Sequence, residues 1–258
     1  MKIVLVPGWN ESSNDMRVFV DGRNGIPGLA AHGFDCIVFP EGGGGIRARI
    51  DRFAEFLADL KTKEPHAFPV ATLGYSAGGL VNRGFLRAYP ERAGDIASVF
   101  QIATPNGGLS EWYMAPTLRF IRFGSDAIDD MDVESPFMAW LNGAHGRYHP
   151  TGDPRRKRWE LDGEPWVITP GMPLFHVVGR LPRHGLRGDG LVEVGPATLN
   201  GRIPHMFIDS NRTNHLNLGG EWNPLTFFFR GWRSDDTIWP TIVDVAARFF
   251  RGEVVAAS

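Results

Sequence analysis

Short apolar runs of strand length alternate with segments of helical periodicity along the first hundred residues of the chain. Between two of these runs, apolar residues recur every three or four positions from Ile46 to Leu60, which predicts a helix with one apolar stripe. Continuous apolar strands separated by amphipathic helices are typical of a parallel sheet covered by helices on both faces. The predicted strands are 3–6, 35–39, 70–73 and 96–102, and the predicted helical segments are 28–32, 46–60 and 77–89.

The alternation breaks after Pro105, where a long segment of different composition begins. Residues 106–172 are rich in Trp, Met, Pro, Gly and charged residues and have little periodicity. Because a structureless loop of that length is uncommon in a compact domain, we expect an inserted cap with short helices of its own. The sheet is expected to resume at 173–178 and 203–208, and a final helix to start near 234 with a capping pair. Its predicted buried residues are Ile238, Ile242, Val245 and Phe249.

Composition and charge narrow the class of protein. A chain of 258 residues with 43% apolar residues can bury one sizeable core, so we expect a single domain of doubly wound α/β type over 1–258. The formal net charge of −2 argues against a dedicated nucleic-acid binder. Cys36 is the only cysteine, which excludes an internal disulfide and a Cys-based zinc site. The apolar start reads as a strand, too short for a secretory leader or a membrane span, so we expect a cytoplasmic protein.

The segment from Gly74 to Gly78 has the pattern Gly-x-Ser-x-Gly, with Ser76 at its centre. It joins a predicted strand to a predicted helix, the context in which this pattern forms a nucleophile elbow. A turn this tight forces the serine into strained backbone geometry, and side chains at the two glycine positions would collide across it. The Ala77 amide begins the helix and can stabilise an oxyanion. The alternative is an ordinary turn of small residues, and we favour the nucleophile.

A serine nucleophile needs a general base, and eight histidines compete for that role. His215 follows the last predicted strand, and in a doubly wound sheet that loop opens at the same edge as the Ser76 turn. We therefore favour His215 as the base. His176 lies inside a predicted strand and is expected to be a core or sheet-face residue. The remaining histidines lie near helix ends, in the cap or beside late loops: His32, His66, His145, His149, His184 and His205.

Two aspartates compete to orient the base. Asp189 lies between two glycines after the strand that ends near Arg180, and a carboxylate in such a bend can turn inward towards an imidazole. The same residues also fit a plain Asp-Gly turn. Asp209 also lies near a strand end, six residues before His215. The position of the two residues favours Asp189 and leaves Asp209 open.

A second oxyanion donor is expected after the first strand. Pro7 and Gly8 turn the chain sharply there, which leaves the amide of Trp9 available to a developing negative charge. The alternative is a Pro-Gly turn that carries a surface tryptophan. With a nucleophile, a base and an acid in place elsewhere, we favour the oxyanion donor.

Together these residues resemble the α/β-hydrolase superfamily, and within it the bacterial triacylglycerol lipases and related esterases. The order Ser, Asp, His along the chain is that of the superfamily. The resemblance implies an α/β-hydrolase fold over the whole chain, a cap or lid over about 106–172, and Asp189 as the acid. The chain departs from the family at Pro7-Gly8-Trp9, where the family has a His-Gly oxyanion segment, and at Asn106, where the family usually has His. The matching segments are ATPNGG at 103–108, SPFMAWLN at 135–142, GDGLVEV at 188–194 and NHLNL at 214–218.

The resemblance implies hydrolysis of carboxylic esters, on a small-molecule or lipid substrate, through an acyl-enzyme intermediate. Some such lipases hold a structural calcium, but its ligands find no match here, so no metal and no cofactor are expected. An acyltransferase with the same triad is the main alternative; a lactonase, an amidase or a non-catalytic binding protein on the same fold are others. Cap aromatics either line an acyl pocket or form the core of the cap; the predicted substrate-binding residues among them are Trp112, Tyr113 and Trp140.

Overall fold

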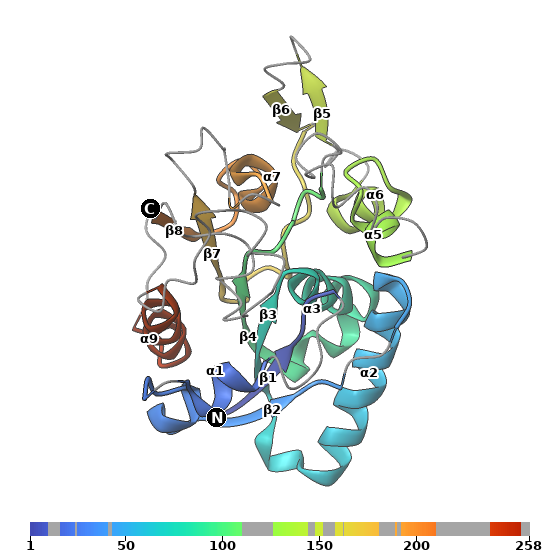
Figure 1. Cartoon of the computed structure of the whole chain (residues 1–258). Coiled ribbons are helices and arrows are strands. Elements are labelled where there is room, and N and C mark those ends of the chain that lie inside the picture. The colour runs from blue at the N-terminus through green and yellow to red at the C-terminus, as the bar shows by residue number, and fades with distance from the viewer. Residues whose placement is uncertain are drawn as a thin grey trace.

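The computed structural model of the chain is a parallel sheet with helices on both faces and a separate hairpin (Figure 1). Six strands lie in the order β2-β1-β3-β4-β7-β8, and every neighbouring pair is parallel. All carboxyl ends therefore meet at one edge. The structure describes residues 1–9, 16–23, 25–40, 43–109, 126–143, 148–151, 158–161, 163–180, 189, 192–209 and 238–253.

All six predicted strands of the sheet are confirmed to within a few residues. Side chains along a strand alternate between two apolar clusters, one on each face of the sheet. Val4 and Val6 belong to one cluster, whereas Ile3 and Leu5 belong to the other. Because strands of a parallel sheet are buried on both faces, they appear in the sequence as continuous apolar runs. The strands are β1 Lys2–Val6, β2 Asp35–Val38, β3 Val70–Tyr75, β4 Ile96–Ile102, β7 Leu174–Arg180 and β8 His205–Asp209.

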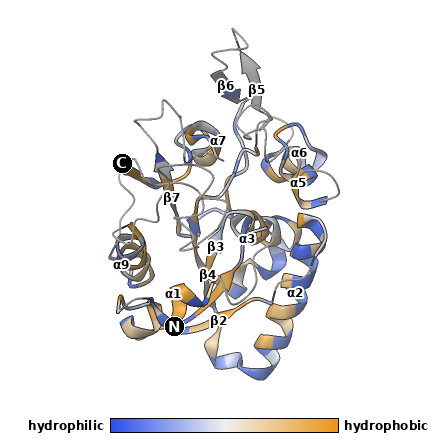
Figure 2. Ribbon diagram, viewed as in Figure 1, coloured by the Kyte–Doolittle hydropathy of each residue, from blue (hydrophilic) through white to orange (hydrophobic). Residues whose placement is uncertain are grey.

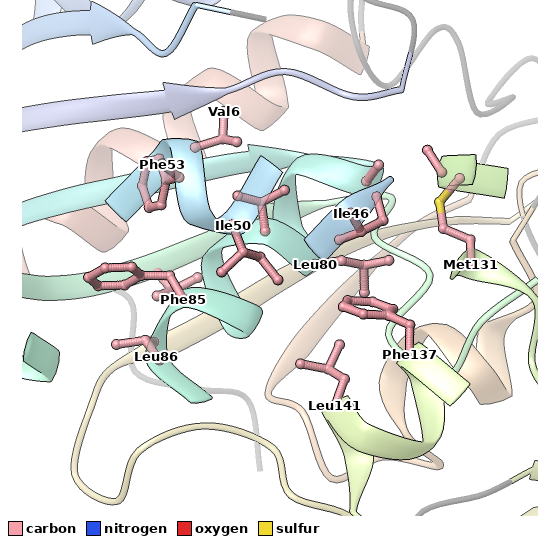
Figure 3. Close-up of a cluster of buried hydrophobic side chains, with 14 of the residues drawn as sticks. Val6, Ile46, Ile50, Phe53, Leu80, Phe85, Leu86, Met131, Phe137 and Leu141 are labelled. Atoms are coloured by element: carbon pink, nitrogen blue, oxygen red, sulfur yellow. The ribbon is translucent and has the colours of Figure 1, made fainter. Parts of the chain in front are cut away.

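Two long helices, α2 Ile46–Lys63 and α3 Ala77–Ala88, cover one face of the sheet. The predicted stripe of α2 is confirmed, and Ile46, Ile50 and Phe53 point into the cluster drawn in Figure 3. In Figure 2, β2 is mostly orange, while α2 carries both orange and blue residues. None of the helices in the described ranges is long and apolar enough to cross a bilayer.

The opposite face is covered by α9 Ile238–Phe250 together with the short elements near the N-terminus. Ile238, Ile242 and Phe249 are buried as predicted, and Val245 packs partly buried against the same cluster. The expected start of this helix near 234 lies outside the described residues. The short elements of the chain are α1 Arg17–Asp21, the 3₁₀ turns η1 Leu29–His32, η2 Pro65–Ala67 and η3 Pro90–Asp95, and α7 Val194–Thr198.

Between β4 and β7 the chain leaves the sheet and then returns beside the strand it left. Two short helices form there, α5 Asp126–Met131 and α6 Pro136–Asn142, as expected for the cap. Ser135 starts α6 because its Oγ accepts a hydrogen bond from the Met138 amide at 3.0 Å. An antiparallel hairpin of β5 Tyr148–Thr151 and β6 Arg158–Leu161 projects away from the sheet (Figure 1). The division into one domain with a cap over 106–172 remains a prediction.

Candidate active site

Ser76 occupies a strained turn between β3 and α3. Its φ and ψ are 50° and −122°, which is the left-handed side of the Ramachandran map. Its amide donates to the Ile102 carbonyl at 2.8 Å, and its carbonyl accepts from the Gly79 amide at 3.1 Å. A non-glycine residue in such a conformation costs roughly 1–3 kcal/mol, so it persists only where the surrounding structure enforces it. The strained turn predicted for this serine is confirmed.

Glycines at two positions permit this turn, each for a different reason. A Cβ on Gly74 would lie 2.5 Å from the Gly79 nitrogen, in the turn of α3 that folds back over the strand. A Cβ on Gly78 would instead collide with the Val6 carbonyl oxygen and lie 2.6 Å from that of Pro7. The expected collision across the turn is therefore found for the first glycine, whereas the second faces the end of β1. The first turn of α3 and the backbone after β1 are in direct contact.

The turn after β1 carries Trp9, the expected second oxyanion donor. Its side chain is partly buried and packs against the cluster under α2 and α3. The preceding carbonyls are held by Arg49 of α2, whose Nη2 donates to Pro7 at 2.7 Å and to Gly8 at 3.3 Å. Arg49 was not identified from the sequence, although it lies three residues after Ile46 on the apolar stripe. A charged residue at a position of the apolar stripe is the feature of the sequence that could have identified Arg49.

Asp189 is buried between β7 and α7. Its Oδ1 accepts a hydrogen bond from the Val192 amide at 2.8 Å, and its own amide donates to the Val192 carbonyl at 3.2 Å. Asp209, its rival, is the last residue of β8 and lies opposite Arg180 in the ladder. One aspartate therefore lies in a loop beyond the sheet and the other still within a strand.

Two histidines of the described chain have partners that define their roles. His176 is fully buried in β7, as expected of a core residue, and its Nε2 accepts the Thr104 amide at 2.9 Å. Burial lowers the pKa of this imidazole to about 3, and the nearby charge of His205 acts in the same direction. His205 places Nδ1 2.7 Å from the Ile203 carbonyl. Within the described ranges, no three His, Cys, Asp or Glu side chains gather as a metal ion would need.

Several predicted site residues lie outside the described residues. His215, the expected base, lies outside the described residues, and so do the cap aromatics Trp112 and Tyr113. Trp140 is described: it lies on α6, with the guanidinium of Arg47 4.7 Å and that of Arg87 5.9 Å from its ring centroid. This placement joins α6 to both α2 and α3. A contact of Trp140 with substrate remains a prediction.

A buried polar network ties α3 to the segment between β4 and β7. Arg83, fully buried, donates to the side-chain oxygens of Asn106 at 3.1 Å and Asn142 at 3.0 Å. It also donates to the carbonyls of Trp166 at 2.6 Å and Val167 at 2.7 Å. Asn106, which replaces the histidine usual in the resembled family, is thus a central member of this network. Arg83 was not identified from the sequence, because α3 also carries Arg87 and a charge on this helix does not by itself indicate burial.

The fold is similar to that of several enzymes of known structure. A metagenomic carboxyl esterase matches with a TM-score of 0.62 and 16% identity, over 98% of this chain and 76% of its own. The mature lipase BlEst2 of Bacillus licheniformis matches at 0.57 and 16%, over 88% of this chain and 90% of its own. The phospholipase PlaB of Legionella pneumophila matches at 0.55 and 12%, over 98% and 64%. No family model and no curated protein matches the chain. Its parallel sheet flanked by helices and its similarity to these enzymes identify the chain as an α/β-hydrolase fold.

Proposed function

We propose that this chain hydrolyses carboxylic esters, with Ser76 as the nucleophile. The observation that carries the proposal is the strained turn of Ser76 at the carboxyl end of β3, where φ is 50°. Such strain is retained where it places a reactive side chain, and the nucleophile elbow of α/β-hydrolases has this arrangement of strand, serine and helix. The printed names of the similar structures include an esterase, a lipase and a phospholipase.

The order of strands supports Asp189 as the acid and His215 as the base. Ser76 follows β3, Asp189 follows β7, and the segment with His215 follows β8, so all three come after carboxyl ends of one parallel sheet. Neighbouring strands are about 4.8 Å apart, which separates β3 from β8 by roughly 14 Å and leaves the loops to close that gap. The chain order Ser, Asp, His is the order found in this fold.

The proposed reaction transfers the acyl group first to the serine and then to water. His215 accepts the proton of Ser76 as Oγ attacks the ester carbonyl, and it returns that proton to the leaving alcohol as the C–O bond breaks. The same imidazole then takes a proton from water, whose oxygen attacks the acyl-enzyme. Collapse of that second intermediate restores Ser76 and releases the carboxylic acid. Asp189 holds the tautomer of His215 and stabilises the imidazolium.

Two backbone amides are proposed to bind the oxyanion. Ala77 is the first residue of α3, where amides have no acceptor within the helix and the helix dipole is positive. Trp9 supplies the second amide from the turn after β1. The contact between Gly78 and the carbonyls of Val6 and Pro7 brings these two backbone segments together. Trp112, Tyr113 and Trp140 are proposed to contact a small-molecule or lipid ester.

Covalent labelling tests the nucleophile. Wild-type protein is treated with a fluorophosphonate and assayed on acyl esters of increasing chain length, beside Ser76→Ala and a Ser98→Ala control. Ser98 is also a buried serine, but it lies within β4. We expect labelling and hydrolysis in the wild type and control, and a loss of about 10⁶-fold in turnover for Ser76→Ala. An unlabelled, inactive wild type overturns the proposal; preferential transfer to added alcohols or thiols would instead establish an acyltransferase.

A further inference from the structure

Arg49 places a guanidinium inside the apolar layer between α2 and the sheet. Its side chain is 1% exposed, whereas Arg47 on the same helix faces solvent. A buried charge strongly destabilises the folded state unless specific partners compensate it. The partners that Arg49 finds include the backbone carbonyls of Pro7 and Gly8, in the turn that carries the proposed Trp9 donor.

The two hydrogen bonds fix the direction of the Trp9 amide. The Gly8–Trp9 peptide is trans, and in a trans peptide the C=O and N–H point in opposite directions. Because the Gly8 carbonyl points at Nη2 of Arg49, at 3.3 Å, the Trp9 N–H points away from that guanidinium. The Pro7 carbonyl is held by the same nitrogen at 2.7 Å, so two successive peptide planes share one anchor.

The same turn also packs against the nucleophile helix. Gly78 lies so close to the Val6 and Pro7 carbonyls that a methyl group would not fit between them. The turn after β1 is therefore held by Arg49 and by the first turn of α3, which begins with Ala77. The relative orientation of the Trp9 and Ala77 amides depends on both contacts.

We propose that Arg49 is a positioning residue that orients the Trp9 amide towards the oxyanion, an inference that rests on the proposed function. A guanidinium supplies several donors in one rigid plane, while a lysine offers a single flexible ammonium. A hydrogen-bond donor displaced by about 1 Å loses most of its effect on a transition state, although it still permits substrate binding.

The first test separates kcat from KM. We expect Arg49→Met to lower kcat for an ester about 10- to 100-fold, with KM changed less than about twofold. Arg49→Lys should fall between this variant and the wild type. Arg52→Met is the matched control, because Arg52 lies on the same helix and bonds a different loop carbonyl, that of Gly43, at 2.8 Å. It should stay within about twofold of the wild type.

A double-mutant cycle then asks whether Arg49 acts through Trp9. Trp9→Pro removes the donor N–H, so in that background Arg49→Met should lower kcat by less than about twofold. A merely structural role predicts the full further loss, and this result would overturn the inference. Circular dichroism and melting curves establish folding; if Arg49→Met is unfolded, Arg49→Lys takes its place in the cycle. An inert wild type overturns the proposed function as well, whereas an active wild type with a fully active Arg49→Met overturns the inference alone.

Discussion

The buried imidazole of His176 on β7 accepts a hydrogen bond from the backbone amide of Thr104, which follows β4. The other ring nitrogen, Nδ1, lies 3.5 Å from Nδ2 of Asn106. Only the neutral imidazole can accept this hydrogen bond from Thr104, since a protonated ring has no acceptor. Burial keeps the ring in that form by lowering its pKa to about 3.

Stability should therefore fall in acid through His176. The folded pKa of about 3 lies below the ordinary value of 6.5, so between these values the unfolded chain binds a proton that the folded chain does not. The contribution of His176 to the free energy of unfolding is complete above pH 6.5. It is lost as the pH falls towards 3, at up to about 1.4 kcal/mol per pH unit. Urea unfolding of the wild type and His176→Gln between pH 7 and pH 4 measures it. Gln keeps a neutral acceptor and should show the shallower slope; parallel slopes would contradict the assignment.

Gly78→Ala should damage both stability and activity. Its methyl group would collide with the Val6 carbonyl, which is fixed by the sheet, and with that of Pro7, which is fixed by Arg49. Overpacking of this kind costs about 1–3 kcal/mol, and the displaced turn carries the proposed Trp9 donor. Gly94→Ala is the control, because a Cβ there meets nothing within 4 Å. Thermal unfolding and ester turnover are measured on both variants, and a wild-type-like Gly78→Ala would refute the close contact.

Asn82→Leu should stabilise the protein. Asn82 is 2% exposed on α3, and neither polar atom of its side chain has a hydrogen-bond partner in the structure as described. An unpaired buried amide costs about 1–3 kcal/mol, and a leucine of similar shape removes that cost. Asn106→Leu is the contrasting variant and should destabilise, since its amide bonds Gln101 and Ala197, each at 2.9 Å. The midpoints of urea unfolding measure the stability of both variants. A destabilised Asn82→Leu would contradict the prediction that the Asn82 amide is unpaired at a cost in stability.

The two candidate acids should differ sharply when neutralised. Asp189→Asn keeps the shape of the side chain but is expected to leave the base in the wrong tautomer, at a cost of about 10⁴-fold in kcat. Asp209→Asn should stay within about tenfold of the wild type, because Asp209 lies at the end of a strand rather than in the loop beyond β7. Single-turnover kinetics on one ester compares them, and the reverse ranking would transfer the role to Asp209.

The centre of the sheet could be predicted because β1, β3, β4 and β7 are buried on both faces, whereas the edge strand β2 is only partly buried. Such strands appear as mostly apolar runs, and the predicted strand 96–102 coincides with β4. The short α1 and α7 were missed because five residues give too little periodicity to detect. The β5–β6 hairpin was missed because its strands carry proline and charge in place of alternating apolar residues.

At the candidate site, the sequence predicted correctly the feature that depends on local backbone conformation. The strained turn of Ser76 follows from two glycines placed between a strand and a helix, whereas nothing local reveals what a buried arginine contacts. Arg49 and Arg83 were overlooked because charge usually indicates solvent exposure, and their partners lie far along the chain. The roles of Asp189 and His215 remain predictions.

Backbone meets backbone where Gly78 passes the end of β1, and no side chain intervenes. Mutagenesis libraries aimed at this junction would therefore yield mostly inactive clones, since any replacement adds bulk where the two main chains already touch. Substitutions intended to change the range of accepted substrates are better made at residues that approach the nucleophile only with their side chains.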